Sequence, residues 1–406
     1  MKAFNESDSK GRLKKVDPES AYKLNPFIAD KIKILNSKTL RLLQTKTQVF
    51  HNPNNKHIRT RLSHTNEVVA NSAIISELLG INTNLCESIA WGHDIGHFPY
   101  GHNAERVLSS VLKAETGIES LKTHHSLLSV IIAELIERKG AGLNLCYETL
   151  EGIINHSRDK GVLFSDDNIK PEYSTVMYAD KISYTFSDIN DSIREGRLTD
   201  KNKIINYCAN KLGFNQRERT MRCINSLCNE SKDYVRFDQV TNPELLSQLK
   251  KSNKLADFKR AKLTDFMLFD LIITKMYNDV YYQINWYEAE NKIKKVYELF
   301  NQSTINDYET VFKKTRVKPL IIESTPDPCL MISLMTDYDI DRLINKELTL
   351  NLVIRSTGLN DTAHHLMRKE TSKESMIRLY SAWGKQPNKS FLFEQLIYPQ
   401  LKKNQL

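Results

Sequence analysis

The sequence lacks long apolar runs, and none approaches the roughly 18 consecutive apolar residues that a membrane-spanning helix needs. Its first residues, MKAFNESDSKGRLKK, are polar and basic and include no apolar stretch of the kind that a signal peptide carries. Both absences argue against a membrane or secreted protein. We therefore expect a cytoplasmic protein.

Cysteine is scarce and scattered, with 6 cysteines among 406 residues. The spacing of Cys223 and Cys228 is too wide for a CxxC pair, and no histidine lies close to them in the sequence. Disulfide frameworks and zinc knuckles depend on closer, paired spacings. The pattern favours reduced thiols.

Internal repeats, Gly/Ser-rich linkers and low-complexity segments are also missing. At 40% hydrophobic residues, the chain can bury a large core. We expect residues 1–25 to form a flexible N-terminal arm and residues 26–200 to form the core. Residues 201–406 would be a mainly helical region that completes the core and supplies subunit contacts. The boundary near residue 200 is placed where residues with a recognisable catalytic or binding role end in the sequence.

The charge balance is basic, with 58 lysines and arginines against 49 aspartates and glutamates and a net charge of +9. Such a balance favours polyanionic partners, either nucleotide phosphates or nucleic acid. One basic cluster suggests a nucleic-acid contact, although an ordinary solvated loop would have the same composition. Its members are Lys250, Lys251, Lys254, Lys259, Arg260 and Lys262.

Hydrophobic periodicity predicts a mainly α-helical fold. Helices are expected over residues 64–79, 85–94, from 103 onward, 125–138, 174–195, 266–287 and 292–300. Gly80 is a natural C-terminal stop, and Asn82 to Asn84 offer caps for the next helix. Two aliphatic patches, Lys318 to Ile322 and Leu348 to Ile354, could pair as a small β element in the C-terminal part.

Imidazole and carboxylate side chains are concentrated between residues 59 and 105. This stretch holds His64, His93, Asp94, His97, His102 and Glu105, although the whole chain has 11 histidines. These groups bind divalent metals and transfer protons near neutral pH. On the predicted helix at 174–195, Asp180, Tyr184 and Asp188 follow one another at successive turns on one face.

A ligand set of His64, His93, Asp94 and Asp180 fits a first-row divalent ion. An ion with open coordination positions lowers the pKa of bound water and polarises a phosphoryl oxygen. The alternative is structural, with His93 capping its own helix and Asp94 pairing with a nearby base.

Three motifs follow one another in the order RTRLSHTNEV, HDIGHFPYGHNAE and DKISYTFSD. Together they resemble the HD-domain phosphohydrolases, and specifically the deoxynucleoside triphosphate triphosphohydrolase branch. That branch includes the bacterial dGTPases and the sterile-alpha-motif HD enzymes. The resemblance covers residues from about 40 to 195. It implies an all-α fold and metal-dependent hydrolysis of a dNTP, with dGTP favoured, to a deoxynucleoside and inorganic triphosphate.

The resemblance also implies roles for individual residues. Arg61 would grip the α-phosphate, Tyr184 would lie under the sugar, and Asp188 would accept a hydrogen bond from the 3′-hydroxyl. His102 would protonate the departing 5′ oxygen, with Glu105 orienting it. The implied metal ligands are His64, His93, Asp94 and Asp180; the implied substrate-binding residues are Gln48, Arg61, Lys181, Tyr184 and Asp188; the implied catalytic residues are His102, Glu105, His97 and His125, with His124 as the alternative to His125.

The implied metal is Mg²⁺ or Mn²⁺, with iron as a further candidate. Ser187 departs from the family pattern, because bacterial relatives often have histidine before the last aspartate of the third motif. No sterile-alpha-motif domain is expected ahead of the core. By analogy we expect a homo-oligomer, with single-stranded DNA or an effector nucleotide as further partners.

Two alternative functions remain open at this point. The chain could be an HD phosphohydrolase acting on a nucleoside monophosphate, a cyclic nucleotide or an alarmone. It could also be a nucleic-acid-binding regulator.

Overall fold

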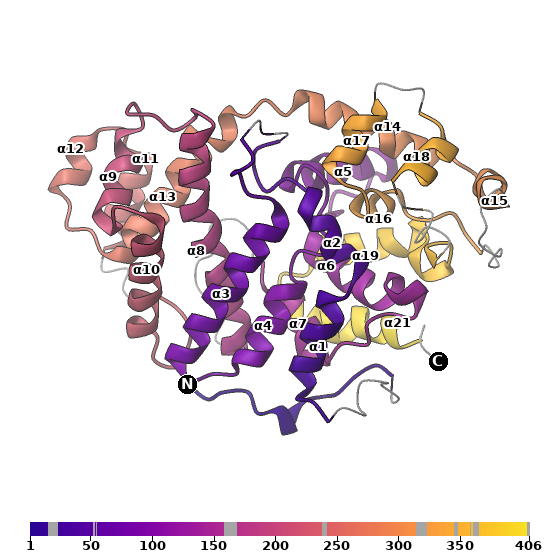
Figure 1. Ribbon diagram of the computed structural model, residues 1–406, viewed down its shortest axis with the longest axis horizontal. Coiled ribbons are helices and arrows are strands. Elements are labelled where there is room, and N and C mark those ends of the chain that lie inside the picture. The colour runs from indigo at the N-terminus through magenta and orange to yellow at the C-terminus, as the bar shows by residue number, and fades with distance from the viewer. Residues whose placement is uncertain are drawn as a thin grey trace.

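The computed structural model describes residues 1–14, 23–51, 53, 55–157, 169–237, 242–313, 323–344, 348–357, 359 and 365–403. These residues form helices joined by loops (Figure 1). Within the described ranges, β structure is confined to isolated bridges, such as the one between Thr47 and Thr60. The predicted all-α class is therefore confirmed.

The first half of the chain builds a bundle in which α3 packs against α4 and α8, and α4 also packs against α1 and α7. Apolar side chains from these helices fill the centre of the bundle and are buried. The helices are α1 (Pro26–Leu35), α2 (Lys38–Leu42), η3 (Leu43–Thr45), α3 (Arg61–Leu79), α4 (Thr83–Gly92), α5 (His102–Thr116), α6 (His125–Ile131), the π-helical turn η4 (Ile132–Ile136), α7 (Tyr147–Asn155) and α8 (Pro171–Arg194).

The second half flanks this bundle on two sides (Figure 1). On one side α10 and α13 pack against α8. On the other side α14 packs against α5 and also contacts α16 and α17. The helices are α9 (Lys203–Leu212), α10 (Gln216–Glu230), α11 (Pro243–Lys251), α12 (Leu255–Arg260), α13 (Asp265–Asp279), η6 (Tyr281–Gln283), α14 (Tyr287–Gln302), α15 (Ile305–Lys313), α16 (Pro328–Ser333), α17 (Asp337–Ile344), α18 (Leu350–Ser356), α19 (Lys373–Lys385), α20 (Lys389–Leu392), η10 (Phe393–Ile397) and α21 (Tyr398–Lys403).

Local capping signals place the helix ends close to where the sequence predicts them. Gly80 follows α3 with a φ of 65°, the left-handed conformation that glycine adopts without a steric penalty. The Asn82 side chain caps α4 by accepting a hydrogen bond from the Leu85 amide at 3.0 Å. α8 covers the predicted 174–195 segment and begins earlier, at Pro171, a residue suited to the first turn of a helix.

Two expectations for the second half are wrong. Leu348 to Ile354, predicted as part of a β element, lies mostly in α18, which Thr349 caps by accepting from the Leu352 amide at 3.2 Å. The apolar face of this short helix is buried, so its aliphatic residues satisfy packing without a strand partner. The other patch, at 318–322, lies outside the described residues. The helix predicted over 266–287 ends as α13 at Asp279, because Val280 leaves the helical conformation with φ −122° and ψ −62°.

Residues 1–14 of the predicted N-terminal arm contact the bundle. The Phe4 amide donates to Glu172 Oε1 at 2.8 Å, and Ser9 Oγ donates to Glu148 Oε2 at 2.6 Å. Arg12 forms an ion pair with Asp30. The flexibility expected for the arm stays a prediction.

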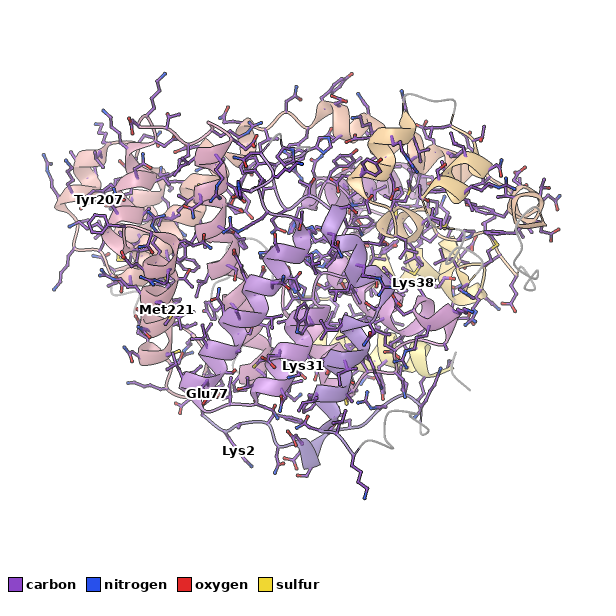
Figure 2. All side chains as sticks on the ribbon, in the orientation of Figure 1. Lys2, Lys31, Lys38, Glu77, Tyr207 and Met221 are labelled. Atoms are coloured by element: carbon purple, nitrogen blue, oxygen red, sulfur yellow. The ribbon has the colours of Figure 1, made fainter. Side chains whose placement is uncertain are left out.

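Side chains fill the spaces between the helices (Figure 2). Lys31 of α1, for example, pairs with Glu87 of α4 at 2.5 Å. The cysteines are free thiols, as the sequence predicts. None of the described helices combines the length and the apolar character needed to cross a membrane.

Candidate metal centre and active site

The first metal-ligand candidate is placed by the start of α3. Thr60 caps this helix in a reciprocal capping box with Ser63, which fixes where the helix begins. His64 follows one turn later and is buried. Its Nε2 lies 2.9 Å from Oδ1 of Asp180 on α8. Two residues separated by 116 positions in the sequence therefore meet directly.

His93 lies at the end of α4, and its ring orientation is fixed by the helix itself. A carbonyl can only accept, so His93 Nδ1 donates to the Ala90 carbonyl oxygen at 2.6 Å. In the neutral ring Nε2 then carries a lone pair, and a metal ion bound there would replace the proton that Asp94 otherwise favours. Within the described part of the chain, His93 Nε2 and His64 Nδ1 are buried without a hydrogen-bond partner. Buried polar atoms are rarely left unpaired, and an imidazole nitrogen in this state suits a metal ion.

Asp94 supplies the negative charge beside these rings. Its Oδ2 accepts from Arg61 Nη1 at 2.6 Å and lies 3.4 Å from His93 Nε2. Burial on its own would raise the pKa of Asp94, but His93 and Arg61 outweigh burial and hold that pKa well below its usual value. Burial would lower the pKa of His93, and Asp94 instead raises it to about 9.

The residues present fit a divalent metal ion. His64, His93 and Asp94 each offer a ligand atom within 4.8 Å of the others. Asp180 lies outside this group and is joined to it by its contact with His64, so its place as a second carboxylate ligand stays a prediction. Two imidazoles and two carboxylates are the donor set of hard to intermediate divalent ions.

The structural alternative for His93 and Asp94 is also visible. His93 does bond to its own helix, and Asp94 does pair with a base, Arg61. Neither contact uses His93 Nε2, so both are compatible with metal binding.

A second group of histidines lies beside Asp94. His97 Nε2 is 3.2 Å from His102 Nδ1, and the His97 ring stacks on the His125 ring with centroids 4.5 Å apart. His97 and His125 are buried, whereas His102 is exposed. The exposed ring is therefore the one that an incoming substrate can reach.

Glu105 has a different hydrogen-bond partner from the one expected. Glu105 Oε1 accepts from both Nδ1 and the backbone amide of His125, each at 2.7 Å. The His102 ring hydrogen-bonds to His97 instead. Glu105 therefore orients His125, and the roles expected for His102 and Glu105 stay predictions.

His124 and His125 lie in different surroundings, because His125 faces Asp94 while His124 packs on Trp383; which of them has the expected catalytic role stays a prediction. His125 Nε2 lies 3.9 Å from Asp94 Oδ1. The His124 ring centroid is 4.8 Å from that of Trp383.

His156, at the end of α7, was missed by the sequence analysis because it stands outside the three motifs. Its Nδ1 donates to the Ile153 carbonyl oxygen at 2.7 Å, and its Nε2 lies 3.2 Å from His125 Nε2. The separation of 3.2 Å is a hydrogen-bonding distance, so one of the two Nε2 atoms donates to the other.

The polar row of α8 continues away from Asp180. Tyr184 and Lys181 are half-buried, and Asp188 is buried. Asp188 Oδ2 accepts from the Tyr281 hydroxyl at 2.6 Å, and burial raises the pKa of Asp188 to about 7. Tyr281 comes from η6, where the sequence contained no motif to identify it.

Gln48 lies on the other side of Arg61. Its carbonyl oxygen accepts from Arg61 Nη2 at 3.4 Å. The side-chain Oε1 is buried and, among the residues that the structure describes, has no hydrogen-bond partner. Gln48 is thus brought next to the candidate phosphate-binding guanidinium.

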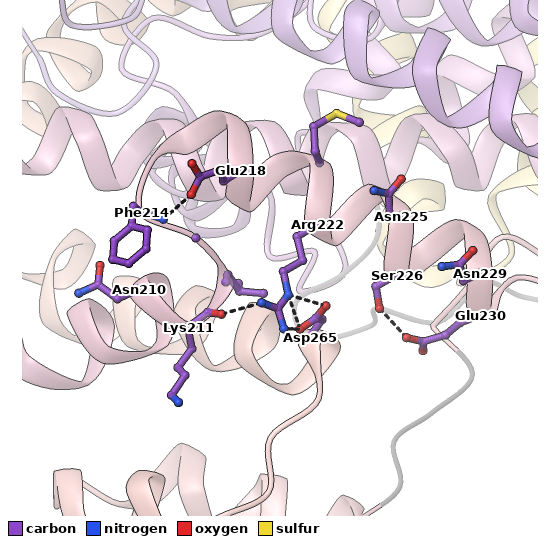
Figure 3. Close-up of a pocket in the computed structure, with 13 residues that line it drawn as sticks. Asn210, Lys211, Phe214, Glu218, Arg222, Asn225, Ser226, Asn229, Glu230 and Asp265 are labelled. Atoms are coloured by element: carbon purple, nitrogen blue, oxygen red, sulfur yellow. Dashed lines mark hydrogen bonds and ion pairs between the residues drawn. The ribbon is translucent and has the colours of Figure 1, made fainter.

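A cavity of about 810 Å³ lies elsewhere, along α9 and α10 (Figure 3). Arg222 spans it, bonding to Asp265 at 2.9 Å and to the Lys211 carbonyl oxygen at 3.0 Å. None of its lining residues belongs to the histidine groups described above.

An all-helical core in which a histidine, a His-Asp pair and a further aspartate meet is the arrangement that defines an HD domain. The HD domain family model matches residues 61–185, from Arg61 to Thr185. Residues 61–185 are therefore similar to an HD domain.

The predicted resemblance within this class is confirmed by curated relatives named deoxyguanosinetriphosphate triphosphohydrolase-like protein. One from Clostridium tetani (strain Massachusetts / E88) is 34% identical over 57% of this chain and 64% of its own length. One from Desulfatibacillum aliphaticivorans is 36% identical over 52% and 58%. One from Caldanaerobacter subterraneus subsp. tengcongensis is 39% identical over 48% and 53%. The chain thus matches between about half and two thirds of the length of these relatives.

Proposed function

We propose that this protein is a metal-dependent dNTP triphosphohydrolase, which hydrolyses a dNTP, with dGTP favoured by analogy, to the deoxynucleoside and inorganic triphosphate. One observation carries the proposal. The candidate metal ligands, a guanidinium and the polar row of α8 converge, because Arg61 bonds to Asp94 and His64 bonds to Asp180 at the head of that row. The names of the curated relatives point the same way.

Arg61 would bind the phosphate at the reacting phosphorus. Its guanidinium is buried between Asp94 and the Gln48 carbonyl oxygen, and its Nε has no hydrogen-bond partner among the described residues. A planar guanidinium can offer two parallel N–H donors to phosphate oxygens. Lys181, half-buried on α8 next to Asp180, would add a second positive charge.

His102 would act on the leaving group. The 5′ oxygen departs more readily when it is protonated, which requires a general acid. His102 is exposed and directs Nδ1 toward His97, which leaves Nε2 free of that contact. Desolvation lowers the pKa of His102 to about 4, so its role as the acid requires the negative charge of a bound triphosphate to favour the protonated ring. The buried rings of His97 and His125 pack beside it and hold it in place, with Glu105 fixing His125.

His64, His93, Asp94 and Asp180 would hold the metal ion. When bound, such an ion polarises a phosphoryl oxygen and lowers the pKa of a water ligand. Mg²⁺ and Mn²⁺ are the ions we propose, with iron as a further candidate at this donor set.

Tyr184 and Asp188 would recognise the sugar. Tyr184 lies on the same face of α8 as Asp180 and Asp188, one turn from each. A ribose 2′-hydroxyl would crowd a tyrosine ring packed under the sugar. Asp188 would accept from the 3′-hydroxyl in addition to Tyr281.

Product analysis tests the proposal. The purified protein is incubated with each dNTP in Mg²⁺ and in Mn²⁺, and the phosphate products are separated by anion-exchange chromatography. We expect deoxynucleoside and intact triphosphate in equal amounts. Release of pyrophosphate or of single phosphates would contradict the proposal. Nucleoside monophosphates, cyclic nucleotides and alarmones, assayed in parallel, test the alternative HD substrates.

The proposal extends to partners. We propose a homo-oligomer, and binding of single-stranded DNA or an effector nucleotide, motivated by the +9 net charge. Binding to DNA phosphates would weaken steeply with added salt. An absence of binding at low salt would remove that partner.

A further inference from the structure

Helix α17, far from the HD motifs in the sequence, contacts the loop between His97 and His102. This loop contains two consecutive residues in the left-handed region, Tyr100 with φ 57° and Gly101 with φ 64°. A tyrosine in that region is uncommon and persists when surrounding contacts hold it there. The contacts that hold it come from the second half of the chain.

Asp337 at the start of α17 holds two backbone segments at once. Its Oδ1 accepts from the Tyr100 amide at 2.9 Å, and its Oδ2 accepts from the Thr47 amide at 3.0 Å. Asp337 is buried, so these charge-assisted bonds form away from competing water.

Asp341, one turn further along α17, holds the Tyr100 side chain. Its Oδ1 accepts from the Tyr100 hydroxyl at 2.9 Å and from Lys292 Nζ of α14 at 2.8 Å. Its Oδ2 lies 3.3 Å from His51 Nε2, and the His51 ring packs edge-on against Tyr100 with centroids 4.6 Å apart.

Lys46 provides a third link between the same regions. Its buried Nζ donates to the His97 carbonyl oxygen at 2.6 Å and also to the carbonyl oxygen of Ser333 on α16. The lysine therefore joins the start of the loop to the helix that precedes α17.

These contacts fix the two segments that carry the proposed phosphate and acid groups. The Lys46 carbonyl oxygen accepts from the Arg61 amide at 3.0 Å, and Gln48 follows directly after Thr47. Gly101 lies so close that a Cβ there would be 3.2 Å from Arg61 Nη2. His102 follows at once as the first residue of α5. A shift of Tyr100 would therefore move both Arg61 and His102.

We propose that Asp337 and Asp341 of α17 are positioning residues, which act through Tyr100 and Thr47 to hold His102 and Arg61 in their working geometry. This inference rests on the proposed function. Small displacements of an acid or a phosphate-binding group lower turnover strongly, because proton transfer depends on distance and direction.

Tyr100→Phe and Asp337→Asn test the proposal, with Asp339→Asn as the matched control. Asp339 lies on the same helix and is buried, but it caps α17 through Thr336 at 2.8 Å and 3.0 Å rather than contacting the loop. We expect Tyr100→Phe to lower kcat for triphosphate release at least tenfold with KM changed less than threefold. Asp337→Asn should change both constants, because it releases Thr47 as well.

Two further measurements separate positioning from general destabilisation. The melting temperatures of both test variants should fall no further than that of Asp339→Asn, and bound metal should match wild type. Hydrogen exchange of peptides covering residues 97–102 should accelerate in the test variants and not in the control. The proposal is overturned if kcat of Tyr100→Phe stays within twofold of wild type, or if exchange of these peptides is unchanged.

Failure of the proposed function gives a different result. Wild type would then release no triphosphate from any dNTP. Hydrogen exchange and metal content do not depend on turnover, so they would still show whether α17 holds the loop.

Discussion

Buried carboxylates in this protein differ in what stabilises their charge. Asp94 pairs with Arg61, which helps to keep its pKa low. Asp327, at the start of α16, instead accepts from neutral donors, the Leu330 amide at 2.7 Å and the Tyr380 hydroxyl at 2.9 Å. Burial raises the pKa of Asp327 to about 7. The charge of Asp327 is therefore a cost to the folded state near neutral pH.

This cost predicts a pH-dependent effect of Asp327→Asn on stability. Because the folded pKa lies above the unfolded one, the folded protein binds an extra proton between about pH 4 and pH 7. The stabilisation from that proton is present at low pH and lost as the pH rises through 7. Between pH 5 and pH 8, the free energy of unfolding of wild type should fall by about 2–3 kcal/mol relative to that of Asp327→Asn. Denaturant unfolding at both pH values measures this difference.

Asp307→Asn is the control for this measurement. Asp307 is an exposed carboxylate whose pKa is lowered by hydrogen bonds from Thr304. Its variant should show no relative gain in stability between pH 5 and pH 8. A flat difference between wild type and Asp327→Asn would contradict the raised pKa.

At the scale of single elements, α8 connects the candidate metal centre to the row of residues proposed to recognise the sugar. A helix repeats every 3.6 residues, so Asp180, Tyr184 and Asp188 share one face. The opposite seam of Ile182, Phe186 and Ile189 is buried. One helix can therefore hold a metal ligand and a sugar contact in a fixed relation.

Asp180→Ala should remove metal binding and activity as thoroughly as Asp94→Ala. The reason is that both carboxylates lie beside the imidazoles, Asp180 at 2.9 Å from His64 Nε2 and Asp94 at 3.4 Å from His93 Nε2. Metal content measured by mass spectrometry after dialysis, together with turnover, checks this expectation.

Asp191→Ala on the same helix is the matched control. Asp191 bonds to Arg59 at 2.9 Å, away from the candidate ligands, so this variant should retain its metal. Full metal occupancy in Asp180→Ala would show that α8 supplies no ligand.

For the whole molecule, the candidate metal site joins three segments. His64 lies in the first turn of α3, His93 and Asp94 directly follow α4, and Asp180 lies on α8. An ion bound to all of them stabilises the folded chain, since the unfolded chain does not bring these groups together.

Removing the metal should therefore lower the melting temperature. At a free metal concentration about 100 times the dissociation constant, the stabilisation is about 2.7 kcal/mol. Thermal unfolding with chelator and after re-addition of Mn²⁺ measures the effect. Asp180→Ala serves as the control, because it should melt at the same temperature with and without metal. An identical melting temperature for wild type in both conditions would contradict the linkage.

The sequence by itself determined the helices and the order of the motifs along them. Caps such as Asn82 and stops such as Gly80 act on neighbouring residues, so their effect can be read locally. The candidate metal ligands could be named because each stands in a short motif. The strand expected at Leu348 to Ile354 failed because aliphatic residues suit a buried helix face as well as a strand.

Only the tertiary structure decided which side chains meet. Glu105 bonds to His125 rather than His102, His156 approaches from α7, and Tyr281 reaches Asp188 across 93 positions of sequence. Asp337 contacts the Tyr100 amide across 237 positions. Such contacts leave no periodic or local signal, because they depend on how whole helices pack. The motifs thus point to the chemistry that we propose, whereas the contacts that hold their side chains come partly from the second half of the chain, as between Asp337 and Tyr100.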